Sequence, residues 1–192
     1  MPERRRHSPF PVTLALCALA LAAPAPALAQ EGAGSGGASP EDPALRPPGK
    51  AVLGADGKAI APPDAPPEVV GVIAAANAIA DKPYRYGGGH RLDFRDRAYD
   101  CSGAVSYALH GGGLLTAPLD SSSFMRWGER GRGRWITVYT NPGHAYVVIA
   151  GLRFDTGGRD RVARRRGRPG TGPRWAGRRS PRGYVARHPA GL

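Results

Sequence analysis

The sequence predicts an α+β domain in which N-terminal helices pack on an antiparallel β-sheet. Two observations support this fold class. Apolar residues in the first half of the folded part recur at helical spacing, whereas residues 135–156 consist of short β-branched and aromatic runs separated by turn-forming residues. Helices that precede the strands, rather than alternate with them, favour an antiparallel sheet with the helices packed against it.

The first 29 residues have the three parts of a secretory signal peptide. Arginines at 4–6 form a basic start, and residues 12–23 form an apolar run that is short for a bilayer span. Ala-Leu-Ala at 27–29 fits a cleavage site, which would make Gln30 the first mature residue. An uncleaved membrane anchor is the alternative. We expect a bacterial protein that is secreted or associated with the cell wall.

Residues 30–67 are predicted to form a disordered linker. They are rich in Gly, Pro, Ala and Ser, and no apolar period runs through them. A short extended piece near residues 51–60 is the one regular element expected here. The core of the folded domain is expected to follow at residues 68–158.

The positive charge of the chain is concentrated at its C-terminus. Residues 159–192 hold 11 arginines and one acidic residue, whereas residues 30–158 hold 13 basic and 13 acidic residues. A block of like charge is typically solvated and often serves as an interaction arm. For an exported chain we expect anionic wall polymers as the partner, or no partner at all. A nucleic-acid interface is the third and least favoured interpretation.

Two helices and a short third one are expected before the sheet. The first begins at residues 66–68, where Pro and Glu suit a first helical turn, and Pro83 ends it. The second covers residues 101–110 and is ended by glycines. The third covers residues 122–127 and is capped by Ser121 or Ser122. The apolar face of the first helix is formed by Val69, Ile73, Ala76 and Ala80.

Four strands are expected from the β-branched and aromatic runs of the second half. Asn-Pro-Gly at 141–143 forms the turn between the first two. The last of them lies inside the arginine-rich segment and is the only regular element expected there. The strands are predicted over residues 135–139, 144–150, 152–156 and 183–187.

Cys101 is the only cysteine left once the signal peptide is removed, so it cannot form a disulfide within the chain. The run Asp-Cys-Ser-Gly at 100–103 places it at the start of the second predicted helix. Free N–H groups and the helix dipole stabilise a thiolate there, and the same groups can hold an oxyanion. We predict that Cys101 is a nucleophile. A small buried hydrophobic residue is the alternative.

A cysteine nucleophile needs a base, which is usually a histidine. His144 opens a predicted strand after a Pro-Gly turn, a position from which its ring can reach across a cleft. His110 lies about two and a half helical turns from Cys101, too far away to pair with it. His90 is in a polar loop and His188 follows the last strand. We therefore predict that His144 is the base.

Strand geometry supplies a candidate for the third catalytic residue. If the second and third strands turn at residues 150–151, Tyr146 faces Asp155, and His144 lies one diagonal away at roughly 7–8 Å between backbone positions. A register shift of one residue would bring Thr156 into this place. An ordinary carboxylate near a turn is the other interpretation of Asp155. No zinc-type spacing exists, so neither a metal nor another cofactor is expected.

Three motifs in this order resemble the NlpC-type peptidoglycan endopeptidases. They are Pro-Tyr-Arg-Tyr-Gly-Gly at 83–88, Asp-Cys-Ser-Gly at 100–103, and Gly-His at 143–144 leading into an apolar strand. The likeness covers about residues 68–156. It implies a papain-like fold with the cysteine on a helix and the histidine on the sheet, and a substrate in the peptide stems of peptidoglycan.

The resemblance also implies three substrate-binding residues. Tyr84 and Ser102 would contact the substrate or the oxyanion, and Ser122 belongs to a segment where the family often has a Pro-Arg-Thr-Ser-like stretch lining the cleft. Two positions depart from the family pattern. The third catalytic residue of the family is commonly a histidine, where Asp155 and Thr156 stand here. Arg-Trp-Ile at 134–136 replaces the usual Pro-Gly-Asp strand start.

Together these features predict an exported cysteine endopeptidase that hydrolyses amide bonds in peptidoglycan stem peptides. Its expected catalytic residues are Cys101, His144 and Asp155. Two other functions stay open. One is an amidase or acyltransferase that uses the same Cys-His pair, and the other is a non-catalytic wall-binding protein on the same fold.

Overall fold

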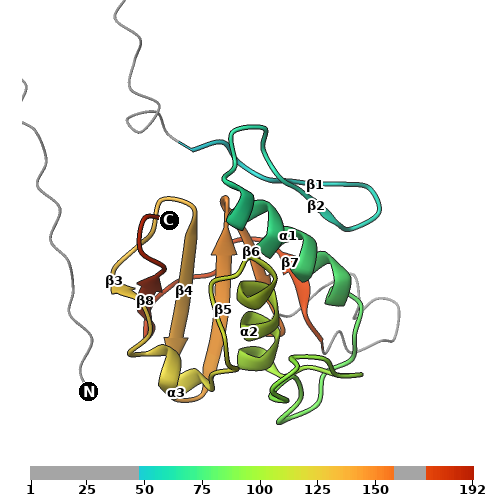
Figure 1. Ribbon diagram of the computed structural model, residues 1–192, viewed down its shortest axis with the longest axis vertical. Coiled ribbons are helices and arrows are strands. Elements are labelled where there is room, and N and C mark those ends of the chain that lie inside the picture. The colour runs from blue at the N-terminus through green and yellow to red at the C-terminus, as the bar shows by residue number, and fades with distance from the viewer. Residues whose placement is uncertain (1–47, 158–171) are drawn as a thin grey trace, which may run out of the picture. The chain divides into compact units, whose positions relative to one another are not determined.

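A six-stranded antiparallel sheet organises the residues that the computed structural model describes, which are 48–157 and 172–192 (Figure 1). The strand order is β3-β8-β4-β5-β6-β7, and every neighbouring pair is antiparallel. The predicted signal peptide lies outside the described residues. The strands are β3 (Glu129–Arg130), β4 (Ile136–Asn141), β5 (His144–Ile149), β6 (Leu152–Asp155), β7 (Arg174–Ala176) and β8 (Val185–His188).

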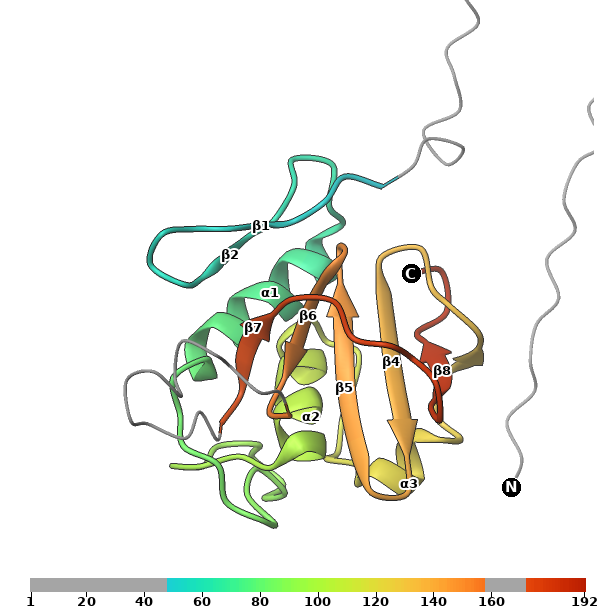
Figure 2. The same ribbon diagram turned by 180° about the vertical axis from the view of Figure 1, so that it is seen from behind.

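Helices α1 (Pro67–Ile79) and α2 (Cys101–Gly111) pack side by side on one face of this sheet, as the two opposite views show (Figures 1 and 2). A short helix, α3 (Ser121–Phe124), lies at the end of β4. The predicted α+β class, with helices packed on an antiparallel sheet, is confirmed. No helix among the described residues is long and apolar enough to cross a membrane.

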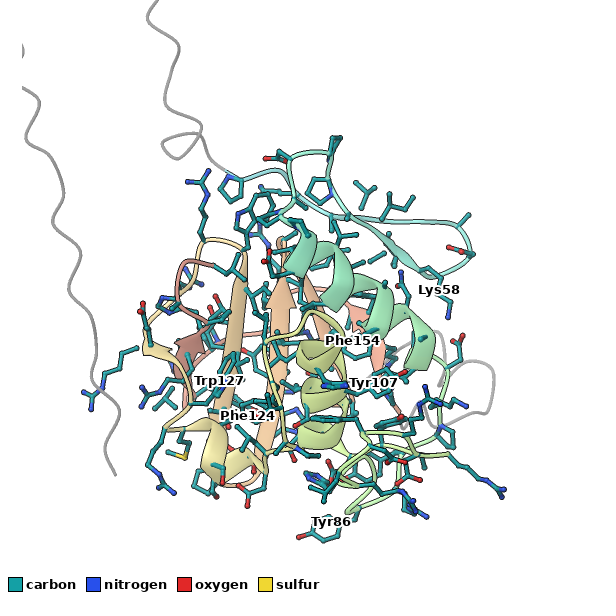
Figure 3. All side chains as sticks on the ribbon, viewed as in Figure 1. Lys58, Tyr86, Tyr107, Phe124, Trp127 and Phe154 are labelled. Atoms are coloured by element: carbon teal, nitrogen blue, oxygen red, sulfur yellow. The ribbon has the colours of Figure 1, made fainter. Side chains whose placement is uncertain are left out.

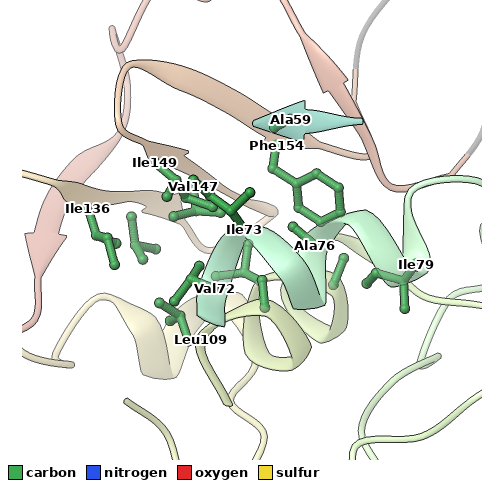
Figure 4. Close-up of a cluster of buried hydrophobic side chains, with 14 of the residues drawn as sticks. Ala59, Val72, Ile73, Ala76, Ile79, Leu109, Ile136, Val147, Ile149 and Phe154 are labelled. Atoms are coloured by element: carbon green, nitrogen blue, oxygen red, sulfur yellow. The ribbon is translucent and has the colours of Figure 1, made fainter. Parts of the chain in front are cut away.

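The hydrophobic core lies between these two helices and the sheet (Figure 4). Helix α1 buries the face that its apolar spacing predicts, with Pro67 at its start and Glu68 in its first turn. Alternate residues of each strand pack against this face. Full burial of one large apolar side chain stabilises the folded state by roughly 1.5–3 kcal/mol. Fully buried members include Val69, Val72, Leu109, Ile136, Val138, Val147, Ile149 and Phe154.

Helix α2 starts where the sequence predicts because Asp100 caps it. The Asp100 carboxylate accepts a hydrogen bond from the backbone N–H of Gly103 at 2.7 Å. Gly103 itself allows a close approach, since a Cβ atom there would collide with the carbonyl oxygen of Gly88. The absence of a side chain at position 103 therefore lets the loop at 83–89 pack directly on the first turn of α2.

Tight turns fix the register of the central strands. The β5–β6 turn has positive φ at both Ala150 and Gly151, 44° and 83°, as the twist of a two-residue hairpin requires. The pairs Val147 with Phe154 and Ile149 with Leu152 follow from this turn. Continued toward the open end, the same register places Tyr146 opposite Asp155, as the sequence predicts.

The predicted linker differs from the structure between residues 48 and 66. This segment contains a hairpin of β1 (Val52–Leu53) and β2 (Ala59–Ile60), so the extended piece expected near residues 51–60 is present. The hairpin is fixed to α1 because the Asn77 side chain accepts from the N–H of Ala59 and donates to its carbonyl. Asn77 appears in the sequence only as one polar residue of a helix, so nothing local indicates this attachment.

The arginine-rich segment also differs from a solvated tail. From residue 172 on it supplies β7, which pairs with β6, and β8, which pairs with β4 and β3. Strand β8 corresponds to the strand expected at 183–187, whereas β7 and β3 were not expected. Between β7 and β8, residues 177–184 cross the sheet face opposite to the helices (Figure 2). Strands β3 and β7 have two and three residues, which is too few to show an alternating pattern in the sequence, although Trp175 in β7 is buried.

Candidate active site

Cys101 is the first residue of α2, and the start of β5 brings His144 to it. Asp100 and the glycine contact at Gly103 hold the helix end in place, while the two-residue turn before His144 holds the start of the strand. The thiol is partly buried and is not in a disulfide. The predicted nucleophile and the predicted base are therefore neighbours, although their positions are 43 apart in the sequence.

Asp155 lies on the far side of the His144 ring. The Nε2–H group of His144 donates to the Asp155 Oδ1 atom at 2.8 Å. With Nε2 engaged in this way, Nδ1 is the ring nitrogen left for the thiol. The Asp155 side chain is 0% exposed and that of His144 is 19% exposed, so the carboxylate is shielded while the imidazole reaches the surface. The structure brings the three residues together in the order Cys101, His144, Asp155.

Asp155 is held by two arginines as well as by the histidine. Its Oδ2 atom accepts from Arg153 Nη1 and, at 3.0 Å, from Arg179 Nη1. The N–H of Gly157 donates to Oδ1 at 2.7 Å. Burial alone would raise the pKa of Asp155, but the bonds from His144 and Gly157 and the charge of Arg153 lower it. The Asp155 carboxylate therefore stays ionised, and its negative charge lies next to the His144 ring.

The ionisation of the pair follows from these contacts. Burial disfavours the charged form of His144, yet hydrogen bonding to Asp155 and to Cys101 raises its pKa to about 9. Burial would raise the pKa of Cys101, but hydrogen bonds from His144 and from the backbone of Ala145 lower it. Each partner favours the charged form of the other, so a thiolate beside an imidazolium is the expected state near neutral pH.

Backbone N–H groups at the start of α2 are available to hold a negative oxygen. The first N–H groups of a helix have no partner inside it. Asp100 occupies that of Gly103, and Ala104 begins the helical bonding. The N–H groups of Cys101 and Ser102 have no hydrogen-bond partner among the described residues. They lie beside the Cys101 thiol, where an oxyanion would form if this thiol attacked a carbonyl group.

Tyr84 lies close to Cys101 and Asp100. It forms an isolated parallel bridge with Tyr99, and the N–H of Arg85 donates to the Tyr99 carbonyl. Burial and then the negative charges of Cys101 and Asp100 raise the pKa of the Tyr84 hydroxyl. The side chain is partly exposed beside the thiol, and its neighbour Tyr86 projects into solvent with 89% of its surface exposed (Figure 3).

The other two predicted substrate-binding residues have different environments. The Ser102 side chain is buried, and its hydroxyl donates to Asp100 at 3.3 Å, so it points into the protein. Ser122 is exposed on α3 and has no hydrogen bond to Cys101 or His144. The cap of α3 is Asp120, which accepts from Ser123 N–H, and not Ser121 or Ser122 as predicted. A carboxylate is available one residue earlier and replaces the hydroxyl in this role.

Sequence patterns missed three side chains that support the site. His90 Nε2 lies 3.0 Å from Asp100 Oδ1, so it links the loop before α2 to the residue that caps this helix. Arg153, on β6, and Arg179, in the crossing segment at 177–184, both hold Asp155. Strand alternation could have placed Arg153 on the same face as Asp155. No local signal indicates His90 or Arg179. In the described part of the chain, no cluster of three or more His, Cys, Asp or Glu side chains could hold a metal.

Comparison with solved structures finds chains of similar fold at low identity. The peptidoglycan hydrolase RipB from Mycobacterium tuberculosis matches at 19% identity and a TM-score of 0.47, over 63% of this chain and 64% of its own. A hypothetical invasion protein of Mycobacterium tuberculosis matches at 22% identity and a TM-score of 0.43, over 62% and 61%. A mutant of the Resuscitation Promoting Factor Interacting protein RipA matches at 21% identity and 0.45, over 65% and 66%.

This chain therefore spans less than two thirds of the length of these structures. RipB is described as a peptidoglycan hydrolase, the class of enzyme to which the family that the three sequence motifs resemble belongs. At these identities the likeness concerns the fold. No family model matches the chain, and no curated protein matches it.

Proposed function

We propose that this protein is a cysteine hydrolase that cleaves amide bonds by acyl transfer. The observation that carries the proposal is the line formed by Cys101 at a helix N-terminus, His144 and the buried carboxylate of Asp155. Nucleophile, base and orienting group are the three parts that covalent acyl transfer requires. The opposite pKa shifts of Cys101 and His144 support an ion pair in the resting state.

The reaction would proceed in two halves. The Cys101 thiolate attacks the amide carbonyl carbon, and the N–H groups of Cys101 and Ser102 bind the oxyanion. Nδ1–H of His144 then protonates the departing amine, which leaves a thioester on Cys101. Neutral His144 next takes a proton from water, whose oxygen attacks the thioester. The acid product leaves, and the thiolate and the imidazolium are restored while Asp155 keeps the ring oriented.

For the substrate we propose the peptide stems of bacterial peptidoglycan. The support is the ordered set of motifs around residues 83–88, 100–103 and 143–144, which resembles the NlpC-type endopeptidases. Tyr84 is the side chain best placed to contact the substrate, because it is exposed beside the thiol. We further propose export, supported by residues 1–29, which would bring the enzyme to the wall.

Mass spectrometry of digested peptidoglycan tests the proposed hydrolase activity and the proposed substrate. Purified protein and a Cys101→Ala variant would be incubated with walls of several stem compositions, and His188→Ala would serve as a control histidine variant away from the site. We expect new peptide termini with the wild type and with His188→Ala, and none with Cys101→Ala. An added amine acceptor that appears in the products would instead identify an acyltransferase.

Binding to the wall is measured in the same samples. If wild type and Cys101→Ala bind every wall equally and neither produces new termini, the hydrolase proposal is wrong. That outcome would identify a non-catalytic wall-binding protein. Mass analysis of the exported protein checks the signal peptide separately, since cleavage as proposed yields a chain that begins at Gln30.

A further inference from the structure

A cavity lined by arginines and tyrosines lies on the sheet face opposite to the helices. Its volume is about 360 Å³, and residues from that face and from the crossing segment at 177–184 line it. Catalytic Asp155 is near it but does not line it. The lining is dominated by four arginines and two tyrosines: Arg132, Arg153, Arg178, Arg179, Tyr139 and Tyr146.

Tyr146 supplies an unsatisfied donor in this cavity. The residue is 1% exposed, and its hydroxyl has no hydrogen-bond partner in the described structure. Burial and the neighbouring Tyr139 raise its pKa to about 12, so the hydroxyl keeps its proton. A buried hydroxyl without a partner is unfavourable. A ligand with an acceptor oxygen would therefore be stabilised at this point.

The arginines leave the cavity strongly positive. Arg178 has no hydrogen bond or ion pair with any other described residue, and Arg132 bonds only to the Tyr139 hydroxyl, at 2.8 Å. Arg153 and Arg179 share a single carboxylate, that of Asp155. No Asp or Glu is among the residues that line the cavity. Four guanidinium groups thus face one carboxylate at the edge of the cavity. The other groups that accept hydrogen bonds from them are uncharged tyrosine hydroxyls and backbone carbonyls.

The aromatic side chains fix the geometry of this site. Tyr139 and Tyr146 pair across β4 and β5 and stack with their ring centres 5.0 Å apart. Arg179 lies over the Tyr146 ring at 5.4 Å and over the Tyr184 ring at 5.2 Å, and it also donates to the Tyr184 hydroxyl. Stacking restricts a guanidinium before any ligand arrives, which reduces the entropy lost on binding.

We propose that this cavity is a binding site for a phosphate-class oxyanion. Its donors come from three directions: Arg132 from the loop before β4, Tyr146 from the sheet, and Arg178 from the crossing segment. Donors spread in this way suit a tetrahedral anion of high charge, and arginine forks match its oxygens. The anion is either free phosphate or a phosphodiester of a polyol-phosphate polymer. The proposal concerns binding and does not depend on the proposed hydrolysis.

Calorimetric titration at fixed ionic strength tests the site. The full chain would be titrated with inorganic phosphate, with a glycerol-phosphate polymer and with acetate. We expect saturable binding of phosphate, the polymer or both, and much weaker binding of acetate. Binding by phosphate alone identifies the free ion as ligand, and stronger binding by the polymer identifies the phosphodiester.

Variants show whether binding occurs in this cavity. Arg178→Ala and Arg132→Ala should each weaken binding about tenfold, and Tyr146→Phe about fivefold. Arg126→Ala removes an exposed arginine that does not line the cavity and should bind as the wild type does. Circular dichroism confirms that each variant is folded. The absence of saturable binding, or an equal loss in Arg126→Ala, would overturn the proposal.

Discussion

The residue that controls the candidate site is Asp155. Its carboxylate accepts hydrogen bonds from the His144 imidazole and from the two arginines behind it, and its side chain is fully buried. A buried carboxylate with several charge-assisted bonds is costly to neutralise, because every partner loses its counter-charge. The properties of His144 and of the surrounding structure should therefore both respond to a change at this one position.

Asp155→Asn keeps the size of the side chain and removes its charge. We expect kcat/KM to fall at least about 100-fold, because the imidazole loses the group that orients it and stabilises its charged form. Assays on stem peptides measure this, with Asp81→Asn, an exposed surface carboxylate, as the matched control. Urea unfolding of both variants separates catalysis from stability. Wild-type activity in a folded Asp155→Asn protein would contradict the assignment.

The charge states of Cys101 and His144 predict the pH range of activity. The active form has a thiolate and an imidazolium, so kcat/KM should rise as pH passes the lowered pKa of Cys101 and fall as pH passes about 9, where His144 loses its proton. In Asp155→Asn, the alkaline fall should move to lower pH.

Alkylation by iodoacetamide checks the acidic side of this profile, since it reports the thiolate directly. Its rate should already be high at neutral pH. A rate that rises only near the ordinary thiol value of 9.0 would show that no ion pair forms.

At the scale of the elements, the contact between α2 and the loop at 83–89 decides where the Cys101 thiol lies. Gly103 allows the Gly88 carbonyl to approach the first turn, and Asp100 joins the two by bonding to both Gly87 and Gly103. These bonds place Tyr84 and Cys101 on the same side of the molecule. The loop and the helix therefore act as one unit in forming the site.

Gly103→Ala tests this unit. The new methyl group would collide with a backbone carbonyl, so the loop or the helix must move, at a cost of roughly 1–3 kcal/mol in unfolding free energy. Thermal unfolding and kcat/KM should both fall. Gly177→Ala is the control, because a Cβ atom there meets nothing within 4 Å. Equal stability of the two variants would show that the close approach has no energetic role.

For the molecule as a whole, the segment from residue 172 onward belongs to the folded structure. Its strands β8 and β7 pair with β4 and β6, so they flank the central strands within the sheet. The segment also buries Trp175 and brings Arg179 to Asp155. Trp175 Nε1–H also donates to the Asn77 side chain, which in turn holds the β1–β2 hairpin. The two ends of the described chain are thus joined through one asparagine.

Removal of residues 172–192 should abolish cooperative unfolding. The truncated chain would expose the edges of β4 and β6 and would lose the partners of Phe154 and Asp155. We therefore expect aggregation, or loss of the near-UV circular dichroism signal that reports packed aromatic side chains. Arg182→Gln, an exposed change within the same segment, should leave unfolding as in the wild type. A truncated protein with unchanged unfolding would mean that the segment is a dispensable tail.

The sequence by itself determined the elements whose signals are local. Pro67 and the apolar spacing after it define α1, Asp100 defines the start of α2, and residues 150–151 define a turn. That turn fixes strand register, and register alone placed His144 near Asp155, because side chains alternate with a period of two residues. A chemical argument about a single cysteine was enough to predict Cys101 as the nucleophile.

Only the tertiary structure decided the contacts between distant residues. Arg179 reaches Asp155 across 24 positions, and Trp175 reaches Asn77 across 98, without any pattern in the sequence near either partner. The same holds for Ser102, whose hydroxyl turns inward because Asp100 and His90 offer it partners. A polar or charged residue in a sequence shows what it can bond to, and only the packing of the chain selects the partner.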